Sequence, residues 1–119
     1  MEGMEARVEL NYLLDFYGPL LTPHRQEVLR LYCEEDLSQQ EIAEQLKITR
    51  QGVFDAIGKA RRQLAAYEEK LGLVRRYLAQ GDAAARCLEA LDEIAPSPQD
   101  APALSRARQA LEEILKDRL

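Results

Sequence analysis

Hydrogen-bond donors are concentrated in a short stretch in the middle of this 119-residue chain. Ammonium and guanidinium groups neutralise phosphates, and guanidinium and carboxamide groups also reach base edges. We predict a nucleic-acid-binding site made by Lys47, Thr49, Arg50, Gln51, Lys59 and Arg62. Arg50 and Gln51 would contact base edges or phosphates at the start of a helix, and the other four would contact phosphates.

Catalytic and metal-binding patterns are weak in this sequence. The carboxylates of Asp15, Glu27 and the acidic run 34–36 have no His or Lys placed beside them by spacing. We expect His24 to lie at the surface, and there is no glycine-rich phosphate loop. We therefore expect a binding protein and not an enzyme, with no catalytic residues, no metal and no cofactor.

The two cysteines, Cys33 and Cys87, are 54 positions apart and are not at metal-ligand spacing from His24. We expect both to be reduced thiols, buried or half-buried. We find neither a signal peptide nor an apolar run approaching the roughly 20 residues of a membrane span. We therefore expect a cytoplasmic protein that does not interact with membranes.

The candidate binding residues belong to a predicted helix-turn-helix over 38–64. Ser38 and Glu41 have the spacing of a capping box, in which each side chain bonds the other residue's backbone N–H. A short helix, 39–46, follows, and Thr49 has the side chain of an N-cap for a second helix. The small Ala43 permits a close crossing of the two helices.

The second helix of this motif has two distinct faces at about 100° per residue. We expect Arg50 and Phe54 on a flank between these faces. Asp55 counts against duplex DNA, because its charge opposes contact with the phosphates. The inward face is predicted to hold Val53, Ile57, Ala60 and Leu64, and the outward face Gln51, Asp55, Gly58 and Arg62. Other aromatic residues are expected in the core: Tyr12, Phe16, Tyr17 and Tyr32.

An apolar three-four alternation continues beyond the motif and predicts a long helix as far as Leu78. Gly72 weakens this helix and is a candidate break. An apolar line of this length needs a partner helix, either from the C-terminal part of the chain or from a second copy, and we favour a homodimer. We call the predicted surface the interaction seam; it consists of Ile57, Leu64, Tyr67, Leu71, Val74 and Leu78.

The remaining periodicity predicts an all-α fold. Helices are expected over 5–17, from Pro23 to about residue 33, over 83–95 and over 102–118. We divide the chain into a helix-turn-helix core domain, 1–79, and a helical tail, 80–119, with a Pro-rich joint at 96–102.

Charge is unevenly distributed along the chain. The formal net charge is −5 overall. Residues 1–37 carry three basic and eight acidic groups. Residues 38–78 carry eight basic and five acidic groups, and residues 79–119 carry five basic and eight acidic groups. The segment with the predicted motif is therefore the basic part of an acidic protein, which is consistent with a locally positive face.

Four segments, in this order along the chain, resemble the YlxM family. Members of this family are small helix-turn-helix proteins that are typically encoded beside the signal recognition particle GTPase. The four segments are LLDFYGPLLTP, RLYCEEDLSQQEIAEQL, ITRQGVFDAI and LAAYEEKLGL, within residues 10–78. The stretch 37–64 also resembles region four of bacterial sigma factors. The resemblance implies a sigma-region-four-like helical fold and a role in the signal recognition particle pathway. It does not cover the tail.

Two functions are consistent with these patterns. In the first, residues 38–64 bind nucleic acid, either DNA or the RNA of the signal recognition particle. In the alternative, the helix-turn-helix is a scaffold, and the interaction seam or the tail binds a protein partner. The resemblance makes the particle's GTPase a candidate for that partner.

Overall fold

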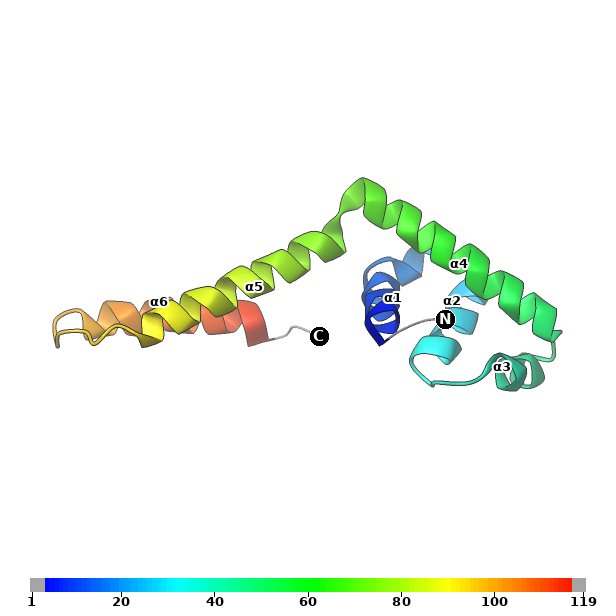
Figure 1. Cartoon of the computed structure of the whole chain (residues 1–119), viewed down its shortest axis with the longest axis horizontal. Coiled ribbons are helices and arrows are strands. Elements are labelled where there is room, and N and C mark those ends of the chain that lie inside the picture. Colours follow the sequence, from blue (N-terminus) through cyan, green and yellow to red (C-terminus); the bar gives the residue numbers. More distant parts are fainter. Residues whose placement is uncertain (1–3, 117–119) are drawn as a thin grey trace. The chain divides into compact units, whose positions relative to one another are not determined.

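The computed structural model describes residues 4–116, and all their regular secondary structure is helical (Figure 1). The fold is all-α, as predicted. The elements are α1 (Met4–Tyr17), a short 3-10 turn η1 (Gly18–Leu20), α2 (Pro23–Cys33), α3 (Gln39–Leu46), α4 (Arg50–Leu71), α5 (Leu73–Asp92) and α6 (Ala101–Lys116).

The chain forms two compact units, which divide between Val74 and Arg75. The first contains the four helices α1 to α4, and the second contains α6 and nearly all of α5. The boundary expected from the sequence, between residues 79 and 80, lies inside α5.

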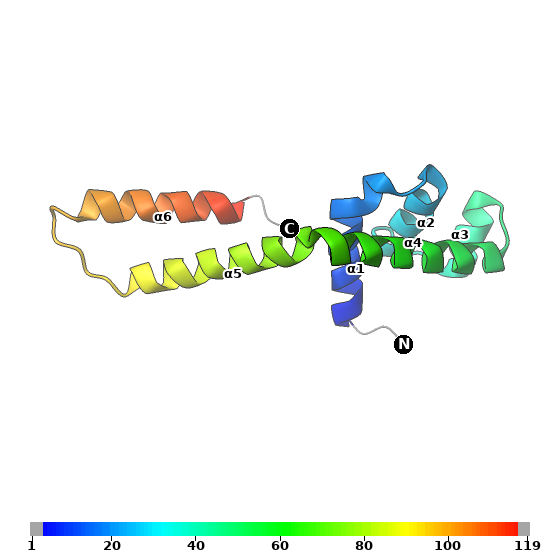
Figure 2. The ribbon, with the colours of Figure 1, turned by 90° about the horizontal axis from the view of Figure 1, so that it is seen from above.

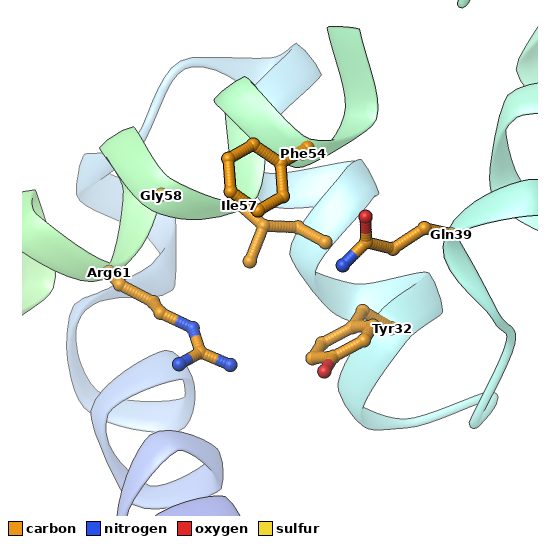
Figure 3. A pocket seen from close by; sticks show the side chains of 6 residues that line it. All are labelled: Tyr32, Gln39, Phe54, Ile57, Gly58 and Arg61. Atoms are coloured by element: carbon orange, nitrogen blue, oxygen red, sulfur yellow. The ribbon is translucent and has the colours of Figure 1, made fainter. Parts of the chain in front are cut away.

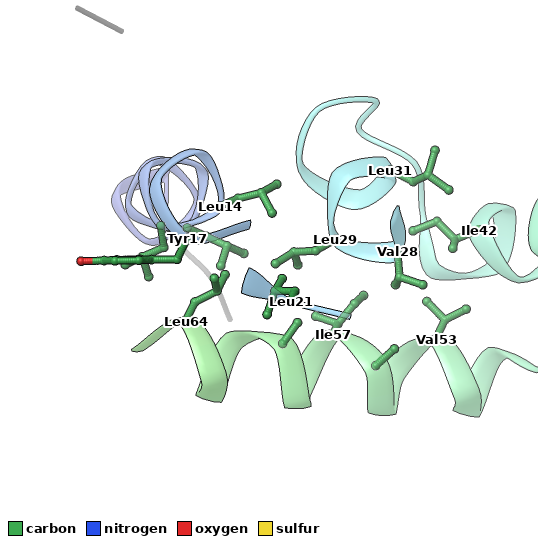
Figure 4. Close-up of a cluster of buried hydrophobic side chains, with 14 of the residues drawn as sticks. Leu14, Tyr17, Leu21, Val28, Leu29, Leu31, Ile42, Val53, Ile57 and Leu64 are labelled. Atoms are coloured by element: carbon green, nitrogen blue, oxygen red, sulfur yellow. The ribbon is translucent and has the colours of Figure 1, made fainter. Parts of the chain in front are cut away.

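The hydrophobic core of the first unit lies along one side of α4. This helix contacts α1, α2 and α3. Figure 4 shows Val53, Ile57 and Leu64 directed from α4 toward the side chains of the other helices. Val53 and Leu64 are 0% exposed, and Ile57 is 5% exposed. Burying a side chain of this size contributes about 1.5–3 kcal/mol, so the inward face of α4 is a principal source of stability.

Capping residues fix where α2 begins. The Thr22 hydroxyl oxygen accepts a hydrogen bond from the Arg25 backbone N–H at 3.3 Å. Pro23 occupies the first helical turn, where a backbone N–H is not needed. The helix starts at Pro23, as the sequence predicted.

The long helix predicted as far as Leu78 ends earlier, at the candidate break. α4 stops at Leu71, and Gly72 adopts the left-handed conformation, with φ 62° and ψ 27°. Glycine has no Cβ to clash in this region, so it ends the helix at little cost. A new helix, α5, begins at once with Leu73.

Two polar side chains cap the start of α5. The Tyr17 hydroxyl accepts from the Leu73 backbone N–H at 3.1 Å and donates to Glu68 Oε1 at 2.6 Å. The same Glu68 oxygen accepts from the Val74 N–H at 3.0 Å. Backbone N–H groups at a helix start have no acceptor within the helix. Tyr17 and Glu68 therefore provide the acceptors for the first two N–H groups of α5.

The second unit contains a helical hairpin. α5 and α6 run antiparallel and side by side (Figure 2), and Arg108 of α6 pairs with Asp92 of α5. The sequence predicted a break between Leu78 and a helix over 83–95, and this was wrong, because α5 continues through Gly81 from Leu73 to Asp92. One glycine in a helix interior costs only about 1 kcal/mol.

The two thiols have different environments. Cys33 is half-buried, and burial raises the pKa of its thiol to about 11. Cys87 is exposed, contrary to the prediction. The residues of α5 that are shielded from solvent beyond Val74 are Tyr77, Gly81, Ala84, Ala85, Leu88 and Leu91, and Cys87 is not among them.

The described helices, within residues 4–116, include none with the length and apolar composition that crossing a membrane requires.

Candidate nucleic-acid interface

The turn between α3 and α4 has the geometry that the sequence predicts. Ser38 Oγ accepts from the Glu41 N–H at 3.1 Å, and Glu41 Oε1 accepts from the Ser38 N–H at 3.0 Å. This backbone hydrogen bond lowers the pKa of the Glu41 carboxyl. The capping box is confirmed, so the start of α3 is fixed by its own residues.

Lys47 ends α3 in the left-handed conformation, with φ 59° and ψ 45°. Its backbone N–H and that of Ile48 both donate to the carbonyl of Ala43. A left-handed backbone is unfavourable for a residue with a Cβ, so tertiary packing maintains this turn. The side chain of Lys47 is exposed beside the start of α4.

Four of the predicted contact residues are exposed cations: Lys47, Arg50, Lys59 and Arg62. None of them has a carboxylate within salt-bridge distance among residues 4–116. Elsewhere in the chain, Arg7 pairs with Asp36 at 3.3 Å and Arg86 with Asp82 at 3.0 Å. These four cations are thus accessible to an anionic ligand.

The other two predicted contacts already have partners within α4. Thr49 Oγ1 accepts from the Gly52 N–H at 2.9 Å, as the predicted N-cap, and its hydroxyl proton remains available to donate. Gln51 Nε2 donates to Asp55 Oδ1 at 3.0 Å. Asp55 therefore positions Gln51, a role that the sequence analysis did not assign to it.

Gly58 and Arg62 are adjacent on the outward face. A Cβ built on Gly58 would lie 3.4 Å from Arg62 Nη1, so the guanidinium lies over the glycine. The glycine leaves room for this side chain. The two residues share the face predicted for them.

Sequence reasoning missed an aromatic site on the flank of α4. Phe54 is 59% exposed, although large apolar side chains are usually buried. It lines a pocket together with Tyr32 of α2, which was expected in the core but is half-buried. A signal was present, because Phe54 lies off the apolar line of its helix.

Arg61 faces the same pocket. Its guanidinium carbon lies 5.9 Å from the centroid of the Tyr32 ring, and that of Arg7 lies 4.7 Å from it. Partial burial lowers the pKa of Arg61. Of the neighbouring Arg61 and Arg62, only Arg62 was a predicted contact residue; Arg61 faces the pocket, and Arg62 is exposed.

The structure divides the predicted interaction seam between different environments. Ile57, Leu64 and Val74 are buried within the first unit. Tyr67 packs against the same core and is half-buried. Leu71 and Leu78 are exposed, at 47% and 44%. Partner binding through these residues stays a prediction, and the exposed leucines are the available part.

A capped α3, a tight turn and a long α4 with an inward apolar face define a helix-turn-helix protein. The chain belongs to the UPF0122 family of helix-turn-helix proteins, described as YlxM / p13 like, whose model matches residues 4–97. The resemblance to the YlxM family found in the sequence is thereby confirmed.

Relatives extend the match beyond residues 10–78. A UPF0122 protein of Acetivibrio thermocellus is 44% identical over 116 residues, covering 95% of this chain and 99% of the relative. One from Desulforamulus reducens is 39% identical over 112 residues, covering 92% and 93%. One from Geobacillus kaustophilus is 47% identical over 74 residues, covering 62% and 67%. The likeness therefore includes α5, although the segments that suggested the family all lie within residues 10–78.

Proposed function

We propose that this chain is a non-enzymatic accessory protein that binds nucleic acid through the outward surface of its helix-turn-helix. The observation that carries the proposal is the set of exposed, unpaired cations at the turn and along α4. Such groups in an otherwise acidic protein concentrate positive potential on one surface. The family resemblance suggests the RNA of the signal recognition particle as the first ligand to test, with duplex DNA as the comparison.

A titration over a range of salt concentrations tests this proposal. Protein binding to a phosphate backbone releases the salt cations that are condensed on the nucleic acid. The affinity therefore falls as the salt concentration rises. Arg50→Ala combined with Arg62→Ala should lower the slope of log affinity against log salt by roughly two. Fluorescence anisotropy with labelled RNA and labelled duplex DNA measures both slopes in the full chain.

A matched control removes the same charge elsewhere. Lys70 and Arg76 are exposed cations outside the helix-turn-helix, so Lys70→Ala combined with Arg76→Ala should change the slope much less. An equal loss in both double variants would show that binding is not localised to α4. Binding that is independent of salt would reject phosphate contact altogether.

The exposed leucines favour a second function, protein interaction. Leu71, Leu73 and Leu78 are 47%, 41% and 44% exposed within eight residues of one another. A homodimer or a protein partner, with the signal recognition particle GTPase tested first, would bury them. Sedimentation of the wild type and of Leu71→Ala measures self-association, and a monomer at all concentrations would reject the homodimer.

A further inference from the structure

A pocket of about 250 Å³ opens between three helices of the first unit (Figure 3). Tyr32 comes from the end of α2 and Gln39 from the start of α3. The other four lining residues all belong to α4. The lining residues are Tyr32, Gln39, Phe54, Ile57, Gly58 and Arg61.

The pocket combines three kinds of group that recognise a nucleobase. Phe54 offers an exposed aromatic face at its edge. Figure 3 shows the Gln39 carboxamide directed into the pocket, and within residues 4–116 this side chain makes no hydrogen bond. Arg61 supplies a cation on the opposite side. Aromatic rings and guanidinium planes stack on bases, and carboxamides bond their edges.

We propose that this pocket takes an unpaired base of a folded RNA that is bound across α4. The base stacks on Phe54, the Gln39 carboxamide bonds its edge, and Arg61 faces its polar atoms. Arg50 lies on the same flank of α4 as Phe54, so its guanidinium can pair with a phosphate next to the bound base. This assignment rests on the proposed function and specifies the ligand of that site.

The arrangement of the outward face favours an unpaired base over a duplex groove. The carboxylate of Asp55 lies in the centre of that face, where it would oppose insertion between two phosphate backbones. Gln51, the side chain best placed to read a base pair, already donates to Asp55. The ring of Phe54 and the carboxamide of Gln39 line the pocket beside this face instead. Proteins read RNA sequence mainly at such splayed bases in loops and bulges.

A pair of RNA hairpins tests the proposal in the full chain. One carries a single bulged fluorescent purine analogue, and the other has the same stem without the bulge. Stacking on Phe54 should quench the analogue, and the wild type should bind the bulged hairpin roughly tenfold more tightly, which is within the range for one base–aromatic stack.

Phe54→Ala separates this pocket from general phosphate binding. The side chain is exposed, so we expect the variant to fold. It should lose the quenching and the roughly tenfold preference, while its affinity for the unbulged hairpin stays unchanged. Val8→Ala, which truncates an apolar side chain that is 47% exposed on α1, should behave as the wild type.

The outcomes distinguish this inference from the proposed function. If both hairpins bind equally and without quenching, the pocket assignment is wrong and the proposed function stands. If neither RNA binds, both are wrong. Retention of the preference in Phe54→Ala would overturn the assignment, and equal affinity for the corresponding DNA hairpin would overturn the choice of RNA.

Discussion

The two units of this chain differ in how they bury apolar side chains. In the first, Leu29, Ile42 and Leu64 are 0% exposed, and the core includes residues from α1, α2, α3 and α4. In the described part of the second, Ala84 is the single buried hydrophobic residue, and Ile94 and Ile114 are 52% and 49% exposed. The first unit is therefore a rigid scaffold for surface groups, whereas the hairpin has little core of its own.

The largest effect on stability is expected when one leucine in each unit is truncated to alanine and the two losses are compared. Leu64→Ala removes a fully buried side chain of α4, and should lower the free energy of unfolding by about 2–5 kcal/mol. Leu111→Ala removes a half-buried side chain of α6, and should cost less than about 1 kcal/mol, because its site is partly solvated. Chemical denaturation followed by circular dichroism measures both values. Equal losses would contradict the comparison.

The polar cap within the first unit predicts a smaller loss. Tyr17→Phe leaves the Leu73 N–H without its acceptor and removes one of the donors to Glu68 Oε1, which keeps the Val74 N–H. Unfolding free energy should fall by about 1–2 kcal/mol. Tyr32→Phe removes the hydroxyl of a half-buried tyrosine that neither donates nor accepts a side-chain hydrogen bond within residues 4–116, and serves as the control.

The same hydroxyl predicts a dependence on pH. Burial, and then the hydrogen bond to Glu68, raise the pKa of Tyr17 above its ordinary value of 10.0. The neutral form is favoured in the folded chain, so its contribution to stability is complete below pH 10 and is lost as the pH rises through the folded-state pKa. The stability difference between wild type and Tyr17→Phe should shrink above pH 10. A constant difference would show that Tyr17 does not titrate as described.

Gly58→Ala should stabilise the first unit without changing its fold. The new Cβ meets only the flexible end of Arg62 at 3.4 Å, and alanine favours a helix interior by about 0.5–1 kcal/mol. Because the methyl group lines the pocket and lies beneath Arg62, RNA affinity should fall as thermal stability rises. A variant that is less stable than the wild type would contradict the packing described for this face.

Lys47→Gly gives the smallest change in stability. Glycine removes the steric strain of a left-handed residue with a Cβ, which stabilises the folded chain. Glycine also makes the unfolded chain more flexible, which offsets this gain, so the free energy of unfolding should change by less than about 1 kcal/mol. The salt slope of nucleic-acid binding should still fall by roughly one. Lys47→Asn, which tolerates the same conformation, should lower the slope equally. An unchanged slope in both variants would remove Lys47 from the interface.

Local chemistry made the helix-turn-helix predictable from sequence. The capping box at Ser38 and Glu41, the cap at Thr49 and the inward line of α4 depend on residues a few positions apart. Gly72 was a recognisable break for the same reason. The break predicted between Leu78 and residue 83 was wrong because a helix tolerates one glycine, here Gly81, and the sequence does not show how long a helix continues beyond it.

Features that depend on distant residues were not predictable. Tyr17 caps a helix 56 positions away along the chain. The pocket brings together Tyr32, Gln39 and Phe54 from three helices. The candidate cations were found because exposure of charged side chains is the usual outcome. The sequence also placed Phe54 on a flank of its helix, but only the fold shows that Tyr32 and Gln39 lie beside it.

The most direct test of a binding surface on the first unit is an NMR titration of the labelled full chain with unlabelled RNA. We predict that amide shifts appear first at Lys47, Arg50, Gln51 and Phe54, while those of α5 beyond Val74 and of α6 stay unchanged. Shifts confined to α5 and α6, with none in the turn or along α4, would contradict the assignment of the helix-turn-helix as the binding surface.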